Sequence, residues 1–259
     1  LLFPILLGVP QDQEEPPVVE RTAQPAFDAR HVGWDQALRE FVKEGLVDYA
    51  GFKARDGSLR GYLEGLASIP ADKFDALPRA ERLAYWINAY NAFTVRLILD
   101  HYPVKSIKDI GGLFRSPFKK EFIALPNLRR ELLSLDDIEH GILRPQFADP
   151  RVHFAIVCAS KGCPPLRSEA YRAEVLETQL DDQARRFLAD PGKNRVDVEA
   201  KTLHLSPIFK WFREDFEKSA GSVPKFVARF LGPKTAAAIG DGVGWEIEYT
   251  DYDWTLNGN

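Results

Sequence analysis

The chain has 259 residues, of which 45% are hydrophobic and 28% are charged, a composition typical of a folded globular protein with enough length to bury a core. Its formal net charge of −4 and its dispersed basic residues argue against the basic surface that nucleic-acid binding requires, so no nucleic-acid partner is expected. Beyond residue 9, no apolar run approaches the roughly 20 residues that a membrane-spanning helix needs. We therefore expect no transmembrane span in the mature chain.

The first 26 residues differ from the rest of the chain. Residues 1–9 are almost entirely apolar and resemble the hydrophobic part of a signal peptide, with a plain apolar end as the alternative. Residues 10–26 contain four prolines, which favours a flexible tether. The sequence has no methionine, even at position 1, so we expect it to begin after its initiator. The pattern predicts an exported protein of the periplasm or cell envelope, with one folded domain over residues 27–259.

A long amphipathic helix is predicted over residues 79–100. Its broad apolar stripe contains Asn91, and Asn88 lies near the edge of that stripe. A buried asparagine amide without a partner costs about 1–3 kcal/mol. The two amides therefore either line a polar pocket and bind substrate, or bond to loop backbone and hold the fold.

The rest of the domain alternates short helices and short strands, predicted from apolar periodicity and from β-branched or alternating runs. The other predicted helices are at about residues 34–42, 59–66, 134–143, 169–189, 208–212 and 222–239. The predicted strands are a hairpin at 118–124 and 129–135, then 153–157, 195–197, 202–205 and 246–249. No internal repeat or linker follows residue 27. The sequence therefore predicts a single α+β domain, with helices packed on a small, largely antiparallel sheet.

Both cysteines of the chain fall in the stretch from His153 to Arg167. Its first half is apolar and partly β-branched, which predicts a short buried strand that ends at Cys158. The glycine and the proline pair that follow cannot continue a strand, so Cys163 and Arg167 are expected near the tip of a turn. Loops held by a rigid strand are favoured places for binding and catalysis.

Three roles are open for Cys158 and Cys163. In an exported protein they can form a disulfide, or remain plain structural thiols, if the turn brings them together. They can also contribute to a metal site with histidines from elsewhere, although the chain has no second cysteine pair. Finally, one of them can be a nucleophile, which requires a nearby base and a lowered pKa.

His140 and His153 are the histidines best placed for a site. His140 directly follows Glu139, and an imidazole held by a carboxylate is the usual arrangement of a general base; a helix histidine satisfied by its neighbours is the alternative. Arg167 can clamp a substrate carboxylate or pair with an acid such as Glu139. The sequence has no nucleotide-binding loop, no paired CxxC motif and no HExxH motif, so no cofactor or metal is predicted.

Three long motifs resemble a known family. They are Trp86–Ala92, Ser134–Arg144 and His153–Arg167. Shorter stretches that resemble the same family are Val47–Ala50, Leu205–Trp211 and Tyr252–Trp254. Together, from about residue 33 to 257, they are similar to the domain of unknown function 547 family. The resemblance implies a domain often found in exported bacterial proteins and in larger eukaryotic chains, and it implies no reaction.

Two functions fit these residues. In the first, the protein is a Cys/His-dependent acyl transferase or hydrolase that acts on a polar or peptide-like substrate. Cys163 or Cys158 would be the nucleophile, His140 the base and Glu139 its orienting acid. The asparagine pair of the long helix would donate hydrogen bonds to an oxyanion or to a substrate amide.

In the second, the protein is a non-catalytic ligand-binding module of the cell envelope with a structural cysteine pair. Its pocket for an unidentified small molecule or peptide would be lined by Asn88, Asn91, Arg167 and a histidine, His140 or His153. The state of the two thiols separates these hypotheses, because a nucleophile must be free and reactive whereas a structural disulfide leaves no free thiol.

Overall fold

The computed structural model describes residues 26–111, 116–129 and 131–258. The expected signal remnant at residues 1–9 and residues 10–25 of the expected tether lie outside the described residues. Helices dominate, and the strands form two small sheets, which confirms the predicted α+β class. Within the described ranges, no helix combines the length and apolar character needed to cross a bilayer.

One long helix, α5 (Arg79–His101), organises the first lobe. Every residue from Leu83 to Val95 is buried, so this part of the helix is covered on all sides. The elements before it are α1 (Val32–Phe41), β1 (Val42–Lys43), β2 (Leu46–Val47), α2 (Tyr49–Ala54), α3 (Gly57–Ser68) and α4 (Ala71–Asp75). The sequence therefore predicted the central helix to within one residue at its C-terminus.

A second set of short elements follows α5 along the chain. They are α6 (Lys108–Gly111), η1 (Pro117–Lys119), η2 (Asp137–Leu143), α7 (Arg144–Phe147), α8 (Val152–Ala155), η3 (Ala173–Val175) and α9 (Leu176–Leu188). Of these, η2 and η3 pack against α5. The η2 segment is a π-helix, a rare conformation that often occurs at functional sites, and it contains Glu139 and His140.

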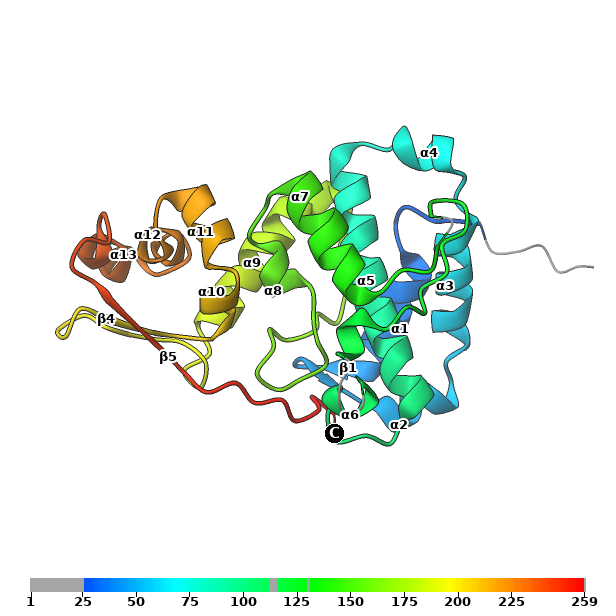
Figure 1. The fold of residues 1–259 in the computed structure, drawn as a ribbon, viewed down its shortest axis with the longest axis horizontal. Helices are drawn as coiled ribbons and strands as arrows, with labels where there is room; N and C mark the ends of the chain where they lie inside the picture. The colour runs from blue at the N-terminus through cyan, green and yellow to red at the C-terminus, as the bar shows by residue number, and fades with distance from the viewer. Residues whose placement is uncertain (1–25, 112–115, 130, 259) are drawn as a thin grey trace, which may run out of the picture.

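The C-terminal lobe consists of a three-stranded sheet and four helices. They are β3 (Arg195–Asp197), β4 (Thr202–Leu205), α10 (Ile208–Trp211), α11 (Arg213–Ala220), α12 (Val223–Ala228), α13 (Pro233–Ile239) and β5 (Glu246–Tyr249). The central strand β4 pairs antiparallel with β3 and parallel with β5. Figure 1 shows this lobe at the opposite end of the molecule from α1, α3 and α5, with α8 and α9 between the two ends.

Each lobe has its own hydrophobic core, and α8 joins them. The second core is rich in phenylalanine, and Phe154 of α8 lies at its centre, against Phe187, Phe209 and Phe216. The next residue, Ala155, belongs to the first core. The short segment that precedes the cysteines is therefore fixed from both sides.

The C-terminal segment returns from β5 to the first lobe, as Figure 1 shows in red. Leu256 forms an isolated antiparallel bridge with Ser160, and Gly258 forms a parallel bridge with Val47. Residues 252–258 thus lie beside the loop that carries the cysteines.

The strand predicted at residues 153–157 is wrong, because this segment begins as the helix α8. A short apolar run does not distinguish a buried strand from a buried helical turn. Only from Ile156 onward is the backbone extended. The main-chain groups of Ala155 and Val157 are hydrogen-bonded to the side-chain amide of Asn91 rather than to a neighbouring strand.

Three other elements also differ from expectation. Among the described residues of the hairpin predicted at 118–135, the only β-bridge joins Ile123 and Leu133. The helix predicted at 222–239 is two helices, α12 and α13, since the Gly232–Pro233 pair interrupts the backbone hydrogen bonds. The helix predicted at 169–189 begins only at Leu176, after the 3₁₀ turn η3.

Candidate functional site

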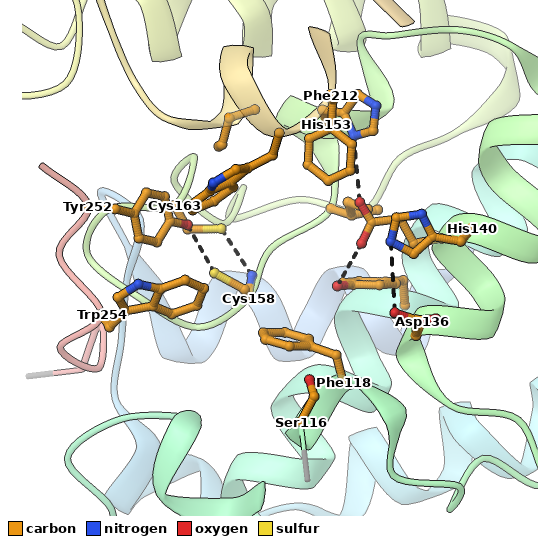
Figure 2. Close-up of a pocket in the computed structure, with 15 residues that line it drawn as sticks. Ser116, Phe118, Asp136, His140, His153, Cys158, Cys163, Phe212, Tyr252 and Trp254 are labelled. Atoms are coloured by element: carbon orange, nitrogen blue, oxygen red, sulfur yellow. Dashed lines mark hydrogen bonds and ion pairs between the residues drawn. The ribbon is translucent and has the colours of Figure 1, made fainter. Parts of the chain in front are cut away.

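A pocket of about 200 Å³ lies between the cysteine loop, the π-helix η2 and α10. Its lining combines two thiols, two imidazoles, two carboxyl groups and six aromatic rings: Tyr90, Ser116, Phe118, Asp136, Glu139, His140, His153, Ile156, Cys158, Cys163, Ile208, Trp211, Phe212, Tyr252 and Trp254. Figure 2 shows the cysteines with Tyr252 and Trp254 on one side of the pocket, and His140 with Asp136 on the other. The pocket therefore has two chemically distinct sides.

The first side is the cysteine cluster, which we define as Cys158, Ser160, Cys163 and Tyr252. The Cys158 Sγ atom lies 3.0 Å from Ser160 Oγ and 3.1 Å from the Tyr252 hydroxyl oxygen. The Cys163 Sγ atom accepts a hydrogen bond from the Cys158 main-chain N–H at 3.0 Å. Both cysteines are free thiols, so the structure contains no disulfide between them.

Hydrogen bonds to the main chain of the cysteine loop hold it in place from two directions. On one side, Asn91 of α5 donates to the Ala155 carbonyl at 2.9 Å and accepts from the Val157 N–H at 2.9 Å. On the other, Gly162 N–H donates to the Asp253 carbonyl at 2.8 Å. A Cβ atom at position 162 would lie 2.9 Å from the Asp253 nitrogen, so this close approach requires glycine.

The environment of Cys158 favours its thiolate. Burial alone would raise the pKa of this thiol, but Cys163, the Ser160 hydroxyl and the Tyr252 hydroxyl together lower it to about 7. Hydrogen bonds to the charged form of an acid stabilise that form. At neutral pH a larger fraction of Cys158 is therefore ionised than of an ordinary cysteine, whose pKa is near 8.5.

Cys163 and Tyr252 have the opposite tendency. Burial raises the pKa of the Cys163 thiol well above its ordinary value, and the neighbouring Cys158 raises it further. Burial also raises the pKa of Tyr252, with both cysteine thiols adding to the effect. Cys158 is thus the ionisable member of the cluster, and the other two remain hydrogen-bond donors.

The second side is the histidine cluster, which we define as Glu139, His140, Arg144, His153 and Asp215. His153 Nε2 lies 2.8 Å from Asp215 Oδ2, and His153 Nδ1 lies 3.6 Å from Glu139 Oε1. The His153 side chain is only 1% exposed and stacks on Phe212 with ring centroids 3.8 Å apart. His153 is therefore buried behind Glu139, the carboxylate that faces the pocket.

The charged side chain of Arg144 contacts both Asp215 and His140. Arg144 donates to both carboxylate oxygens of Asp215, at 2.7 and 3.1 Å. The hydrogen bond with His153, and next the one with Arg144, hold the pKa of Asp215 below its ordinary value of 3.8, against the opposing effect of burial. Arg144 also donates to His140 Nδ1 at 2.8 Å, which places the proton of a neutral His140 on Nε2.

In the part of the chain that the structure describes, no direct hydrogen bond joins the two clusters. Among the described residues, none links either cysteine sulfur to a histidine nitrogen. Tyr90 of α5 lies near both sides: its hydroxyl donates to Glu139 Oε2 at 3.5 Å, and burial, then Glu139 and the cysteines, raise its pKa. The predicted pairing of His140 with Glu139 is not found, because Glu139 approaches His153 instead.

A comparison with family models finds one match over part of the chain. Residues 74–188 match the model of the family described as Protein of unknown function, DUF547. The predicted resemblance is confirmed for this part of the chain, which includes all three long motifs. The cysteines and most of the histidine cluster lie inside the DUF547 match, whereas Asp215, Tyr252 and Trp254 come from the segment after it. No curated protein and no solved structure matched the chain.

The structure keeps Asn88 and Asn91 of the DUF547 segment out of the pocket. Both side chains are fully buried, and each amide forms two hydrogen bonds with main-chain groups of a neighbouring segment. Asn88 does so at Tyr171, where it donates to the carbonyl at 2.7 Å and accepts from the N–H at 3.0 Å. Both amides are hydrogen-bonded to the main chain, so the expected contact with an oxyanion or substrate is not supported.

Arg167, expected to bind substrate or Glu139, also lies outside the pocket. Its guanidinium pairs with Glu169 and Asp182, at 2.5 Å to the latter. Because two acids already neutralise this buried cation, it is not free to bind a carboxylate ligand. Arg167 ties the segment after the cysteines to α9.

Sequence reasoning missed Ser160, Tyr252 and Asp215. Ser160 lies two residues after Cys158 in the His153–Arg167 motif, and Tyr252 begins the Tyr252–Trp254 stretch. Both residues therefore lie in segments that resemble the family. Asp215 had no such signal, since it is an ordinary acid in the first turn of α11. Within the described residues, no group of three or more His, Cys, Asp or Glu side chains is arranged to hold a metal ion.

Proposed function

We propose that the protein is a cysteine-dependent acyl transferase or hydrolase, with Cys158 as the nucleophile. The observation that carries the proposal is the Cys158 sulfur, which lines the pocket with two hydroxyl groups at 3.0 and 3.1 Å. Thiolates, not thiols, attack carbonyl carbon. A sulfur whose pKa is lowered by neighbouring hydrogen bonds and that lines a cavity meets this requirement.

In the first step, the Cys158 sulfur bonds to the carbonyl carbon of an ester or amide and the leaving group departs with a proton. In the second, water attacks the resulting thioester, releases the acid and restores the thiol. In the first step the leaving group takes its proton from solvent, and in the second Glu139 is the pocket-facing carboxylate suited to take the proton of the attacking water. His153 acts through Glu139 as a positioning residue, because its side chain is almost completely buried.

The pocket also limits the part of the substrate that enters it. A cavity of about 150 Å³ is enough to hold a benzene-sized group, so about 200 Å³ accommodates one ring or one medium side chain. Six aromatic rings in the lining favour an apolar or planar group there. The polar or peptide-like remainder of the substrate would extend past Trp211, which is 48% exposed.

The test is acylation by p-nitrophenyl acetate, an activated ester. We expect a rapid release of one equivalent of p-nitrophenol, followed by slow turnover, with one acetyl group recovered on Cys158 by peptide mass spectrometry. Cys158→Ser should abolish the burst, and the matched Cys163→Ser variant should retain it. Acetylation of Cys163 instead, or no faster acetylation of the folded than of the unfolded protein, would reject the proposal.

A non-catalytic binding module is the second candidate function, favoured by the aromatic lining. In this case the pocket holds a ligand and Cys158 forms no acyl intermediate. Thermal stabilisation by an aromatic carboxamide, with no thioester on Cys158 after ester treatment, would favour it over the enzyme.

We also propose that the protein works in the periplasm or cell envelope. The support is the apolar residues 1–9 and the proline-rich residues 10–26. Fractionation of Gram-negative cells that express the full-length gene tests the location. Recovery in the cytoplasmic fraction, with no processing of the chain, would contradict it.

A further inference from the structure

Cys163 is not the nucleophile of the proposed acyl transfer, yet it is held next to Cys158. Its sulfur accepts the Cys158 main-chain N–H at 3.0 Å, and only two bonds separate that nitrogen from the Cβ atom that carries the Cys158 thiol. The side chain is 5% exposed, and that of Cys158 is 9% exposed. Both line the same cavity, so a small molecule can reach the two sulfurs from one side.

We propose that Cys158 and Cys163 form a dithiol that reduces hydroperoxides, with Cys158 attacking the peroxide and Cys163 closing a disulfide. This activity does not depend on the proposed acyl transfer. It rests on the adjacency of two free thiols in a pocket and on the different environments of their sulfur atoms.

The first step consumes the peroxide. The Cys158 thiolate bonds to one oxygen of the hydroperoxide, the O–O bond breaks, and the departing oxygen takes a proton and leaves as water or as an alcohol. Cys158 becomes a sulfenic acid. The hydroxyls of Ser160 and Tyr252 lie next to the reacting sulfur, where they can donate the proton that the departing oxygen needs and regain it from solvent.

The second step joins the two cysteines. The Cys163 sulfur attacks the Cys158 sulfur, the S–O bond breaks, and the hydroxyl leaves as water with the Cys163 proton. In sum, two thiols are oxidised to one disulfide and one peroxide is reduced. An external dithiol, such as dithiothreitol, restores the reduced pair by exchange.

The surroundings of Cys163 suit the order of these steps. While Cys158 is a thiolate, its charge helps to keep Cys163 protonated. Conversion of Cys158 to an uncharged sulfenic acid removes that charge, and the Cys158 N–H remains as a donor to the Cys163 sulfur. Cys163 therefore becomes easier to ionise only after Cys158 has reacted.

The loop also holds Cys163 firmly enough to meet its partner. Cys163 N–H donates to the Ser160 carbonyl at 3.1 Å, and the Lys193 ammonium donates to the Cys163 carbonyl at 2.9 Å. These bonds close the turn between the two cysteines. A disulfide requires Cα atoms within about 7 Å of each other, and the 3.0 Å contact between the Cys158 nitrogen and the Cys163 sulfur already brings the two residues together.

The experiment treats the reduced protein with hydrogen peroxide at neutral pH and follows intact mass and free thiols. We expect loss of two hydrogens, simultaneous loss of both alkylatable thiols, a linked Cys158–Cys163 peptide and full recovery with dithiothreitol. Addition of two or three oxygens to Cys158, with Cys163 still alkylatable, would overturn the proposal.

Two variants assign the roles. Cys163→Ala should accumulate oxygen on Cys158 and lose recovery by dithiothreitol, while Cys158→Ala should leave Cys163 at least tenfold slower to react with peroxide. Equal peroxide reactivity of the two single variants would contradict the assignment. Acetyl transfer from p-nitrophenyl acetate is measured on the same reduced samples, so failure of the redox activity is distinguished from failure of the acyl-transfer proposal.

Discussion

The two sides of the pocket are built by different physical means. In the cysteine cluster, neutral hydroxyl groups and main-chain contacts hold a single ionisable sulfur. In the histidine cluster, two carboxylates lie beside a buried imidazole, and Arg144 forms an ion pair with one of them, Asp215. The thiol of Cys158 is thus surrounded by neutral hydrogen-bonding groups, whereas the histidine side contains an ion pair. The reactivity of the cysteine cluster should therefore respond mainly to loss of a hydrogen-bond donor. The properties of the histidine cluster should respond mainly to loss of a charged side chain.

The largest effect is expected from Glu139→Gln, which removes the pocket-facing acid–base group. General acid–base groups typically contribute about 10²–10⁴-fold to a rate. We expect hydrolysis of the acetyl thioester to slow by about that factor, while the initial p-nitrophenol burst survives, because p-nitrophenol leaves without a proton donor. The matched variant His140→Gln should change the rate only a few-fold. An equal loss in both variants would remove the distinction between Glu139 and His140.

Asn91→Leu tests the support of the cysteine cluster. It leaves the Ala155 carbonyl and the Val157 N–H without partners, and each unsatisfied buried group costs about 1–3 kcal/mol. We therefore expect the free energy of unfolding to fall by about 2–6 kcal/mol. Asn88→Leu is the matched control, since it should destabilise to a similar extent at Tyr171 and leave Cys158 reactivity in the folded protein unchanged. Normal melting and normal thiol reactivity of Asn91→Leu would contradict the role of Asn91.

Tyr252→Phe removes one hydroxyl from the cysteine cluster. A hydrogen bond to a charged group contributes about 1.5–3 kcal/mol, and one pKa unit corresponds to about 1.4 kcal/mol. The pKa of Cys158 should therefore rise by about one to two units, read from the pH dependence of iodoacetamide alkylation. Tyr249→Phe, on the nearby strand β5, should leave the profile in place. An unchanged profile for Tyr252→Phe would show that its hydroxyl does not stabilise the thiolate.

The smallest effect concerns acid stability on the histidine side. The pKa of Asp215 is lower in the folded protein than its ordinary value of 3.8, so its stabilising contribution is complete above about pH 4 and is lost as pH falls through the folded pKa. Asp215→Asn should lower the melting temperature slightly at neutral pH and flatten the acid decline below pH 4. If the melting temperature fell more steeply below pH 4 in Asp215→Asn than in the wild type, the result would contradict this prediction.

The sequence predicted several local elements better than it predicted long-range side-chain partners. The central helix α5 and both asparagines were predicted from periodicity, because a 23-residue helix gives a long, repeated signal. The cysteine turn was also predicted. By contrast, the Cys158–Tyr252 contact joins residues 94 apart, and the His153–Asp215 contact joins residues 62 apart. Local patterns carry no information about such pairings.

The asparagine pair shows the limit most clearly. A polar residue in an apolar stripe predicted a buried hydrogen-bonding role, which Asn91 has. The sequence could not decide between a ligand and the backbone as its partner, since both offer the same donors and acceptors. Here the backbone is the partner, in place of the strand that the segment lacks.

The return of residues 252–258 to the first lobe has a consequence for biosynthesis. Cys158 leaves the ribosome 94 residues before Tyr252, and until that tyrosine folds back the sulfur lacks one of its two hydroxyl partners. In a nascent or C-terminally clipped chain the thiol of Cys158 would therefore be less acidic and less reactive.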